Sequence, residues 1–181
     1  MGTAMDPVLW EKEAQTAYAQ RAYEIAAQAF EKAAGAYDEG GEVLKAAEMR
    51  NNASVAWLQA ERPEAALRCV EGTPELFAQA GDKRRQALAL GNQAAALEAL
   101  GQAEIALEIY RRAADGLKAV GEMENYARVM RRISALQVQT GQQFAALFSM
   151  QAALEYQPKL SPRERMLKSL IGTVQRLMGI K

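Results

Sequence analysis

Side chains that can bind a carboxylate recur in this sequence at intervals of 40 residues. Four of them stand at this spacing: Lys12, Asn52, Asn92 and Arg132. Arg128 lies one helical turn before Arg132, on the same helical face. An arginine meets a carboxylate through two hydrogen bonds, and an asparagine both donates to and accepts from an extended backbone. These residues could therefore hold a peptide. The plain alternative is the solvated face of amphipathic helices.

The residue types needed for most catalytic chemistry are missing. The chain contains no histidine, and Cys69 is its one cysteine. A disulfide within the chain, a Cys/His metal site and a Ser-His-Asp arrangement are therefore excluded. Carboxylates and lysines remain, but no pair of them is forced together. We expect no enzyme activity, metal or cofactor, and we expect Cys69 to be a small buried hydrophobic residue.

The elements that must position these side chains are helical hairpins repeated every 40 residues. Gly41, Gly81 and Gly121 stand at equal intervals, and each is followed closely by an acidic residue. Each unit holds two segments rich in Ala, Leu, Glu, Gln and Arg, which favour helices. The first segments cover roughly 42–60, 83–100 and 123–140, and the second begin near 63, 103 and 143. A fixed period of this length predicts an all-α solenoid.

Glycine and proline mark the turns and one interruption. Gly101 and Gly141 stand between paired helices, where a left-handed residue closes the first helix. Arg21 and Glu61 occupy the equivalent positions, so those two turns are expected to close differently. The sequence Gly72-Thr73-Pro74 interrupts the second helix of the second unit. Because proline clashes with the preceding turn, we predict a stop near Val70 and a restart at Pro74, capped by Thr73.

The repeat divides the chain into an array and two flanking segments. Residues 1–5 are expected to be either a leader that remains from cloning or disordered, and residues 6–160 to form the array. Its units are expected at about 6–40, 41–80, 81–120 and 121–160. Asp6-Pro7 provides a cap and a first-turn proline for the first helix.

Residues 161–181 have the features of one further helix. Ser161 and Glu164 form a capping box around Pro162. Seven apolar residues then line one helical face: Met166, Leu167, Leu170, Ile171, Val174, Leu177 and Met178. A solenoid needs its last unit covered by a helix that is polar outside. We therefore predict that this helix caps the array.

The repeats resemble the tetratricopeptide repeat (TPR) family, in a lengthened 40-residue form. The stretch Gly91-Asn92-Gln-Ala-Ala-Ala-Leu-Glu-Ala-Leu-Gly101 looks like the "GNLGNAYYALG" sequence of such repeats. The run Glu104-Ile-Ala-Leu-Glu-Ile-Tyr110-Arg-Arg-Ala113 is similar to their second helix. The resemblance covers about residues 6–157. It implies a right-handed α-solenoid of about four helix hairpins, with a concave groove lined by the first helix of each repeat.

The same resemblance implies where a peptide would bind. It places Lys12, Asn52, Asn92 and Arg132 in one groove-facing column. In TPR domains that grip a terminal carboxylate, an Asn in one repeat is followed by a Lys/Arg pair in the next. Asn92 with Arg128 and Arg132 matches that half of the motif. In the other half, which asks for a Lys and an Asn, this chain has Asn51 and Val55.

Charge narrows the choice of partner only slightly. The 22 basic and 22 acidic residues cancel. Residues 1–60 carry a net charge of −4, and residues 122–181 carry +5. Aromatic residues do not alternate with basic ones, which argues against nucleic acid. No apolar stretch is long enough to cross a bilayer, so we expect a cytoplasmic protein that is not inserted in a membrane.

These features favour a protein-interaction scaffold that binds a peptide segment of a partner, at about micromolar affinity. The alternative is a self-associating structural module, with a homodimer formed through the convex side or the apolar last helix.

Overall fold

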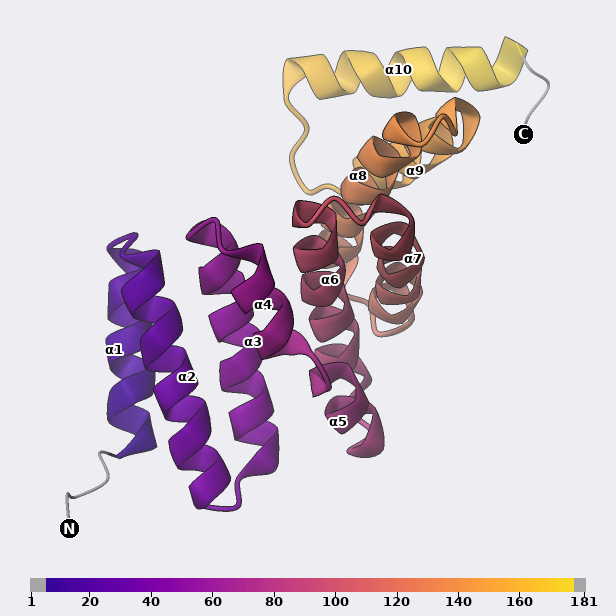
Figure 1. The fold of residues 1–181 in the computed structure, drawn as a ribbon. Helices are drawn as coiled ribbons and strands as arrows, with labels where there is room; N and C mark the ends of the chain where they lie inside the picture. Colours follow the sequence, from indigo (N-terminus) through magenta and orange to yellow (C-terminus); the bar gives the residue numbers. More distant parts are fainter. Residues whose placement is uncertain (1–5, 178–181) are drawn as a thin grey trace.

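The computed structural model describes residues 6–177, and every regular element in that range is an α-helix. The helices, in chain order, are α1 (Pro7–Ala19), α2 (Tyr23–Glu39), α3 (Val43–Gln59), α4 (Pro63–Val70), α5 (Thr73–Gln79), α6 (Lys83–Ala99), α7 (Ala103–Ala119), α8 (Met123–Gln139), α9 (Gln143–Glu155) and α10 (Pro162–Leu177). Helices that follow one another pack side by side from α1 to α9, except α4 and α5, which both pack against α3 and α6 (Figure 1). The predicted all-α solenoid is confirmed.

Small residues allow the helices of the array to approach closely. Ala26, Ala66 and Ala106 recur every 40 residues in the second helices, and all three are fully buried. Gly116 in α7 marks one close approach, because an added Cβ would lie 2.8 Å from the Cβ of Ala87 in α6. Alanine and glycine at these contacts therefore set the spacing between helices.

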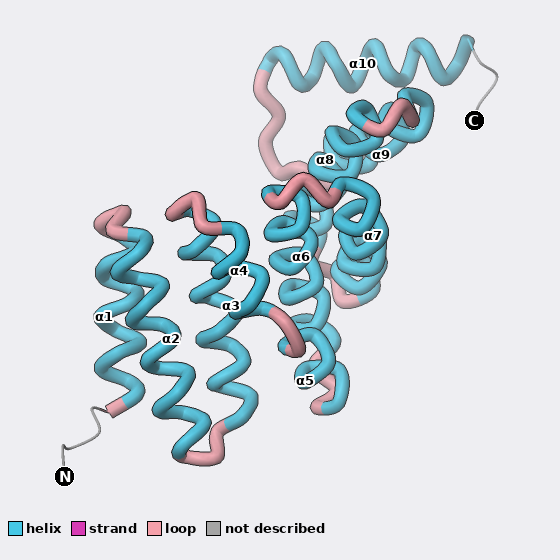
Figure 2. Tube along the Cα trace, in the orientation of Figure 1, coloured by secondary structure: helices cyan, strands magenta, loops and turns pink. Residues whose placement is uncertain are grey.

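The turns inside the hairpins all use the same left-handed closure, contrary to our expectation for two of them. Gly101 and Gly141 have φ of 76° and 77°, as predicted. Arg21 and Glu61 adopt the same conformation, with φ of 62° and 59°. The repeat geometry imposes this backbone, although a side chain makes it less favourable. Short loops join the helices throughout the array (Figure 2).

The second unit contains the predicted helix interruption. Helix α4 ends at Val70 and α5 begins at Thr73, with Gly72 left-handed between them at φ 76°. The predicted cap is wrong, because Thr73 already belongs to the first turn of α5. Its hydroxyl donates to the Val70 carbonyl over 2.8 Å instead. Thr73 therefore ties the new helix back to the end of the old one.

The two ends of the chain carry the expected helix caps. The Asp6 carboxylate accepts from the Val8 amide over 2.9 Å. At the other end, the Ser161 amide donates to Glu164 over 2.8 Å, and the Glu164 amide donates to the Ser161 hydroxyl over 3.3 Å. This reciprocal pair is the capping box predicted for α10.

Helix α10 lies across the ends of α8 and α9 and packs mainly against α9 (Figure 1). Of its apolar stripe, Ile171 is buried at 3% exposure, whereas Leu170 and Leu177 are 55% and 83% exposed. The helix thus covers the end of the array only in part. The predicted leader 1–5 and Met178, assigned to this stripe, lie outside the described residues.

Candidate functional site

A cavity of about 510 Å³ lies between α6 and α8, and we call it the α6–α8 cavity. Asn92 of α6 and both Arg128 and Arg132 of α8 line it. Apolar residues supply much of the remaining wall, including Leu88 and Val129. A cavity of this size with a few convergent polar groups is typical of a ligand site.

The repeat explains why these three residues meet. Asn92 and Arg132 are 40 residues apart, so they occupy the same position in the first helices of successive units. Arg128 precedes Arg132 by one turn and therefore shares its face of α8. The trio predicted from the sequence thus lines one cavity, although its role in binding stays a prediction.

Asn51 of α3 lies beside this trio. The Asn92 side-chain amide donates to the Asn51 carbonyl oxygen over 3.0 Å. This bond fixes the orientation of the Asn92 amide and leaves its oxygen able to accept a further hydrogen bond. Asn51 therefore positions Asn92 rather than lining the cavity itself.

The two other predicted residues are placed differently. Asn52 is half-buried in α3 and is not among the residues that line the α6–α8 cavity. Lys12 is exposed on α1 and lines a separate hollow of about 410 Å³ with Leu9 and Glu13. The column of four does not converge on one ligand, because its members are spread along the array from α1 to α8.

Arg132 already has a carboxylate partner that the sequence did not reveal. Its Nε donates to Glu98 Oε2 over 2.9 Å, and its second nitrogen lies 2.6 Å from Glu98 Oε1. Glu98 also accepts from the Tyr110 hydroxyl over 2.8 Å. Burial, followed by the charge of Glu98, raises the pKa of Tyr110, so this phenol stays protonated. A ligand carboxylate would have to compete with Glu98 for Arg132.

One signal could have identified Glu98. Tyr18, Leu58 and Val138 occupy the equivalent position in the other units, so Glu98 is the acidic exception in that column. An acid at such a position, one hairpin away from an arginine, indicates an ion pair between neighbouring units.

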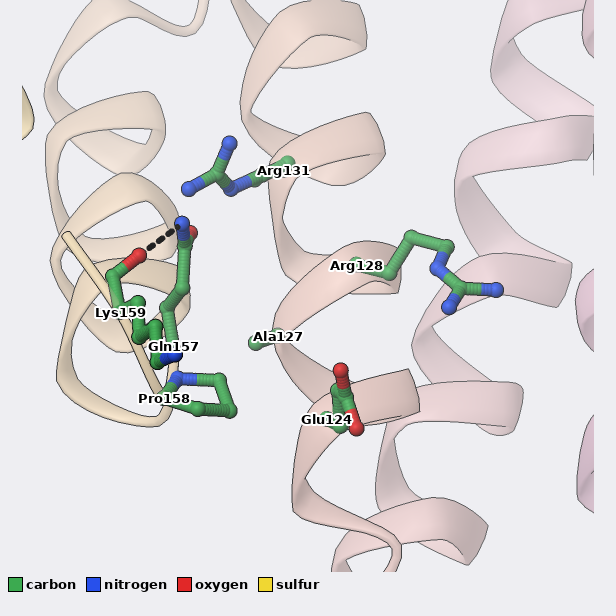
Figure 3. Close-up of a pocket in the computed structure, with 7 residues that line it drawn as sticks. All are labelled: Glu124, Ala127, Arg128, Arg131, Gln157, Pro158 and Lys159. Carbon is green, nitrogen blue, oxygen red and sulfur yellow. Dashed lines mark hydrogen bonds between the residues drawn. The ribbon is translucent and has the colours of Figure 1, made fainter. Parts of the chain in front are cut away.

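Among the residues that the structure describes, Arg128 is the cation of this site that has no ion pair. Its side chain is exposed, and no ion pair or hydrogen bond within residues 6–177 engages its guanidinium. It borders both the α6–α8 cavity and a second hollow of about 420 Å³ on the other side of α8. Figure 3 shows Arg128 and Arg131 pointing to opposite sides of that helix.

Arg131 borders the second hollow and links α8 to α10. Arg131 lies 2.6 Å from the Glu164 carboxylate of α10. Gln157 donates to the Lys159 carbonyl over 2.9 Å in the loop before α10 (Figure 3). These contacts anchor the loop and the start of α10 on α8. Helix α10 thus brings an acid to a position that looks solvent-facing within α8 alone.

Cys69 lies in a buried contact between the first two units, as expected of a small hydrophobic residue. Its thiol donates to Glu31 over 3.0 Å, and the Trp57 indole nitrogen donates to the same carboxylate over 2.7 Å. Burial, together with Glu31, raises the pKa of the Cys69 thiol to about 12. The thiol therefore stays protonated at neutral pH and is a poor nucleophile.

The stacked hairpins define the class of this protein as a helical-repeat solenoid. Residues 8–157 match the model of a family described as "Soluble NSF attachment protein, SNAP". The match covers most of the chain, so this protein belongs to that family. The prediction of a helical-repeat family is confirmed, although the family is not specifically TPR.

The family consists of helical, non-enzymatic adaptor proteins that bind other proteins. Membership of this family supports a general protein-binding role for this chain. No curated protein matches its sequence. Within residues 6–177, none of the helices is both long enough and apolar enough to span a bilayer.

Proposed function

We propose that this protein is an interaction scaffold that binds a carboxylate-bearing peptide segment of a partner in the α6–α8 cavity. The observation that supports it most directly is the position of Arg128. Its guanidinium borders the cavity, has no ion pair among the described residues, and lies beside the oriented Asn92 amide.

The two arginines have different roles in this proposal. Arg128 binds the carboxylate of the peptide, because none of the described residues engages its donors. Arg132 keeps its ion pair with Glu98. It places a positively charged side chain at the edge of the cavity. Asn92 accepts from a backbone amide of the peptide. Leu88 and Val129 pack against an apolar side chain next to the carboxylate.

The expected affinity is modest. A charge-assisted hydrogen bond contributes about 1.5–3 kcal/mol, and ordering a flexible peptide offsets part of that gain. Two or three such bonds with some apolar contact correspond to a Kd of about 1 μM. Binding through an exposed arginine also weakens as salt is raised.

The test is affinity selection from a pool of random-sequence peptides with free carboxyl termini. A matched pool carries amidated termini, and bound peptides are identified by mass spectrometry. We expect the wild type to enrich peptides with a carboxylate, and Arg128→Glu to lose them. Arg111→Glu, an exposed charge reversal on α7, serves as the control and is expected to retain them.

Two outcomes would contradict the proposal. One is equal enrichment from both pools together with no effect of Arg128→Glu. The other is an equal loss for Arg111→Glu, because that result would indicate a general effect of net charge rather than a site at α8.

A further inference from the structure

The fourth unit replaces exposed acids with exposed aromatic residues. Glu24, Glu64 and Glu104 occupy one column in the first turns of α2, α4 and α7, and all three are exposed. At this position α9 has Phe144, which is 67% exposed. The same chain thus shows that glutamate suits this position when it faces water. A phenylalanine there indicates a surface that something else covers.

The next turn of α9 shows the same change. Gln28, Arg68 and Glu108 are the exposed residues of the equivalent column, and α9 has Phe148. Two neighbouring columns therefore change from polar to aromatic in one helix only. Isolated exposed apolar residues are common on proteins, but a paired change on one face is a patch.

Helix α10 extends this patch instead of covering it. A hollow of about 370 Å³ joins the two parts, with Val138, Phe144 and Leu147 on one side and Leu167 and Ile171 of α10 on the other. The exposed large apolar residues of this end of the molecule are Val138, Phe144, Phe148, Met166, Leu167, Leu170, Val174 and Leu177. We call this set the open end.

The size of the open end suits a protein interface. Large side chains that are roughly half exposed, in this number, present on the order of several hundred Å² of apolar surface. Monomeric proteins rarely expose more than that in one patch. A stable dimer of standard size needs about 800 Å² from each partner, so polar residues around the open end would have to join the contact.

The exposed ridge of α10 has the spacing of a helix that pairs with another helix. The ridge residues recur at intervals of three and four, as in paired helices: Leu167, Leu170, Val174 and Leu177. At 100° per residue, Arg165 and Lys168 fall on the opposite side of the helix from Leu170. Two such ridges can therefore meet without bringing those like charges together.

We propose that the open end pairs with the same surface of a second copy of this chain, with the two α10 helices antiparallel. The contact is isologous, so each copy supplies the same patch. Arg163, which lies on the ridge side at the start of α10, then meets the end of the other α10. A helix C-terminus favours a positive charge at that position. The dimer does not involve the α6–α8 cavity and does not depend on the proposed function.

The test measures the mass of the full chain in solution by sedimentation equilibrium, at concentrations from about 1 to about 100 μM. We expect a monomer–dimer equilibrium for the wild type. In the variant Phe144→Glu/Leu170→Glu we expect the dimer Kd to rise at least about 100-fold, because two carboxylates per chain would lose their water. Phe144→Glu restores the residue of the other three units, so the helices should be retained, as circular dichroism will show.

Ile25→Glu is the matched control, since Ile25 is an equally exposed apolar residue at the far end of the array. It is expected to leave the dimer unchanged. A wild type that remains monomeric over the whole range would overturn the proposal. So would a dimer that persists unchanged in the double variant, or one that Ile25→Glu weakens to the same degree. Wild-type monomers that instead bind vesicles of phosphatidylserine and phosphatidylcholine through the open end would likewise reject a second copy as its occupant.

Discussion

The exposed helix faces at the two ends of this solenoid differ in residue type. Helix α1 is the first described helix, and two of its positions are polar where later units are apolar: Glu13 stands where α3 has Ala53, and Thr16 stands where α8 has the buried Leu136. Leu9 stays apolar in the same helix and is 54% exposed. The last hairpin differs in the other direction, because Phe144 replaces Glu104. The N-terminal end therefore exchanges some apolar residues for polar ones, whereas the C-terminal end exchanges polar residues for apolar ones.

The two halves of the array also differ in the residues at their turns. The first two units place Arg21 and Glu61 in the left-handed position, and the last two place Gly101 and Gly141 there. Backbone geometry is the same in all four cases. The first half thus carries a conformational cost that the second half avoids.

The largest expected effect comes from placing a residue of the water-facing end in the buried column. Ala53→Glu puts a carboxylate without a partner at a site with 0% exposure. It is expected to lower the free energy of unfolding by at least about 3 kcal/mol. Glu13→Ala at the matching exposed position is expected to change stability by less than about 0.5 kcal/mol. Urea unfolding followed by circular dichroism measures both. Similar losses in the two variants would remove the contrast between end and interior.

An intermediate effect is expected at the turns. Arg21→Gly and Glu61→Gly are expected to stabilise the protein by up to about 1 kcal/mol each, because glycine adopts a positive φ without steric cost. Gly101→Ala is expected to destabilise it by about 1 kcal/mol for the same reason. Free energies of unfolding measure both signs. If the glycine variants in the first half were destabilised instead, then Arg21 and Glu61 would have to contribute more than their backbone costs.

The smallest effect concerns acid and the attachment of α10. The backbone and side-chain hydrogen bonds of Ser161, with Arg131 nearby, lower the pKa of Glu164 from 4.5 to about 2. Because this pKa is lowered on folding, the ionised carboxylate stabilises the fold fully above about pH 4.5. This stabilisation is lost as the pH falls through about 2. NMR titration of Glu164 is expected to show this low midpoint. In Ser161→Ala the midpoint is expected to move part of the way back toward 4.5, because the amide of residue 161 still donates to Glu164. An unchanged value would show that the Ser161 hydroxyl does not contribute.

Local signals were sufficient to predict most of the fold. The 40-residue period, the glycines and Gly72-Thr73-Pro74 located the hairpins and the break between α4 and α5. Predictions that treated a turn by its residue type alone were wrong at Arg21 and Glu61. Packing of the hairpins fixes the backbone there, and no short stretch of sequence contains that information.

The members of the candidate cavity were predictable only in part, since Lys12 and Asn52, predicted in the same column, do not line it. Register brought Asn92, Arg128 and Arg132 together, because equal spacing in a repeat means equal position. The pairing of Arg132 with Glu98 depends on contact across 34 residues, as does the pairing of Arg131 with Glu164 across 33. Such pairs follow from how neighbouring units pack. Arg128, which has no ion pair among the described residues, could therefore be recognised only in the structure.

The position of Trp57, whose indole donates a hydrogen bond to Glu31 in the first unit, has a practical consequence. The chain has two tryptophans, Trp10 and Trp57, and both lie in the first two units. Their fluorescence therefore reports only on the N-terminal half, while α6 to α10 contribute nothing to the signal. Emission and far-ultraviolet ellipticity recorded in one denaturant series will coincide if the array melts as a single body, and will separate if its halves come apart in turn.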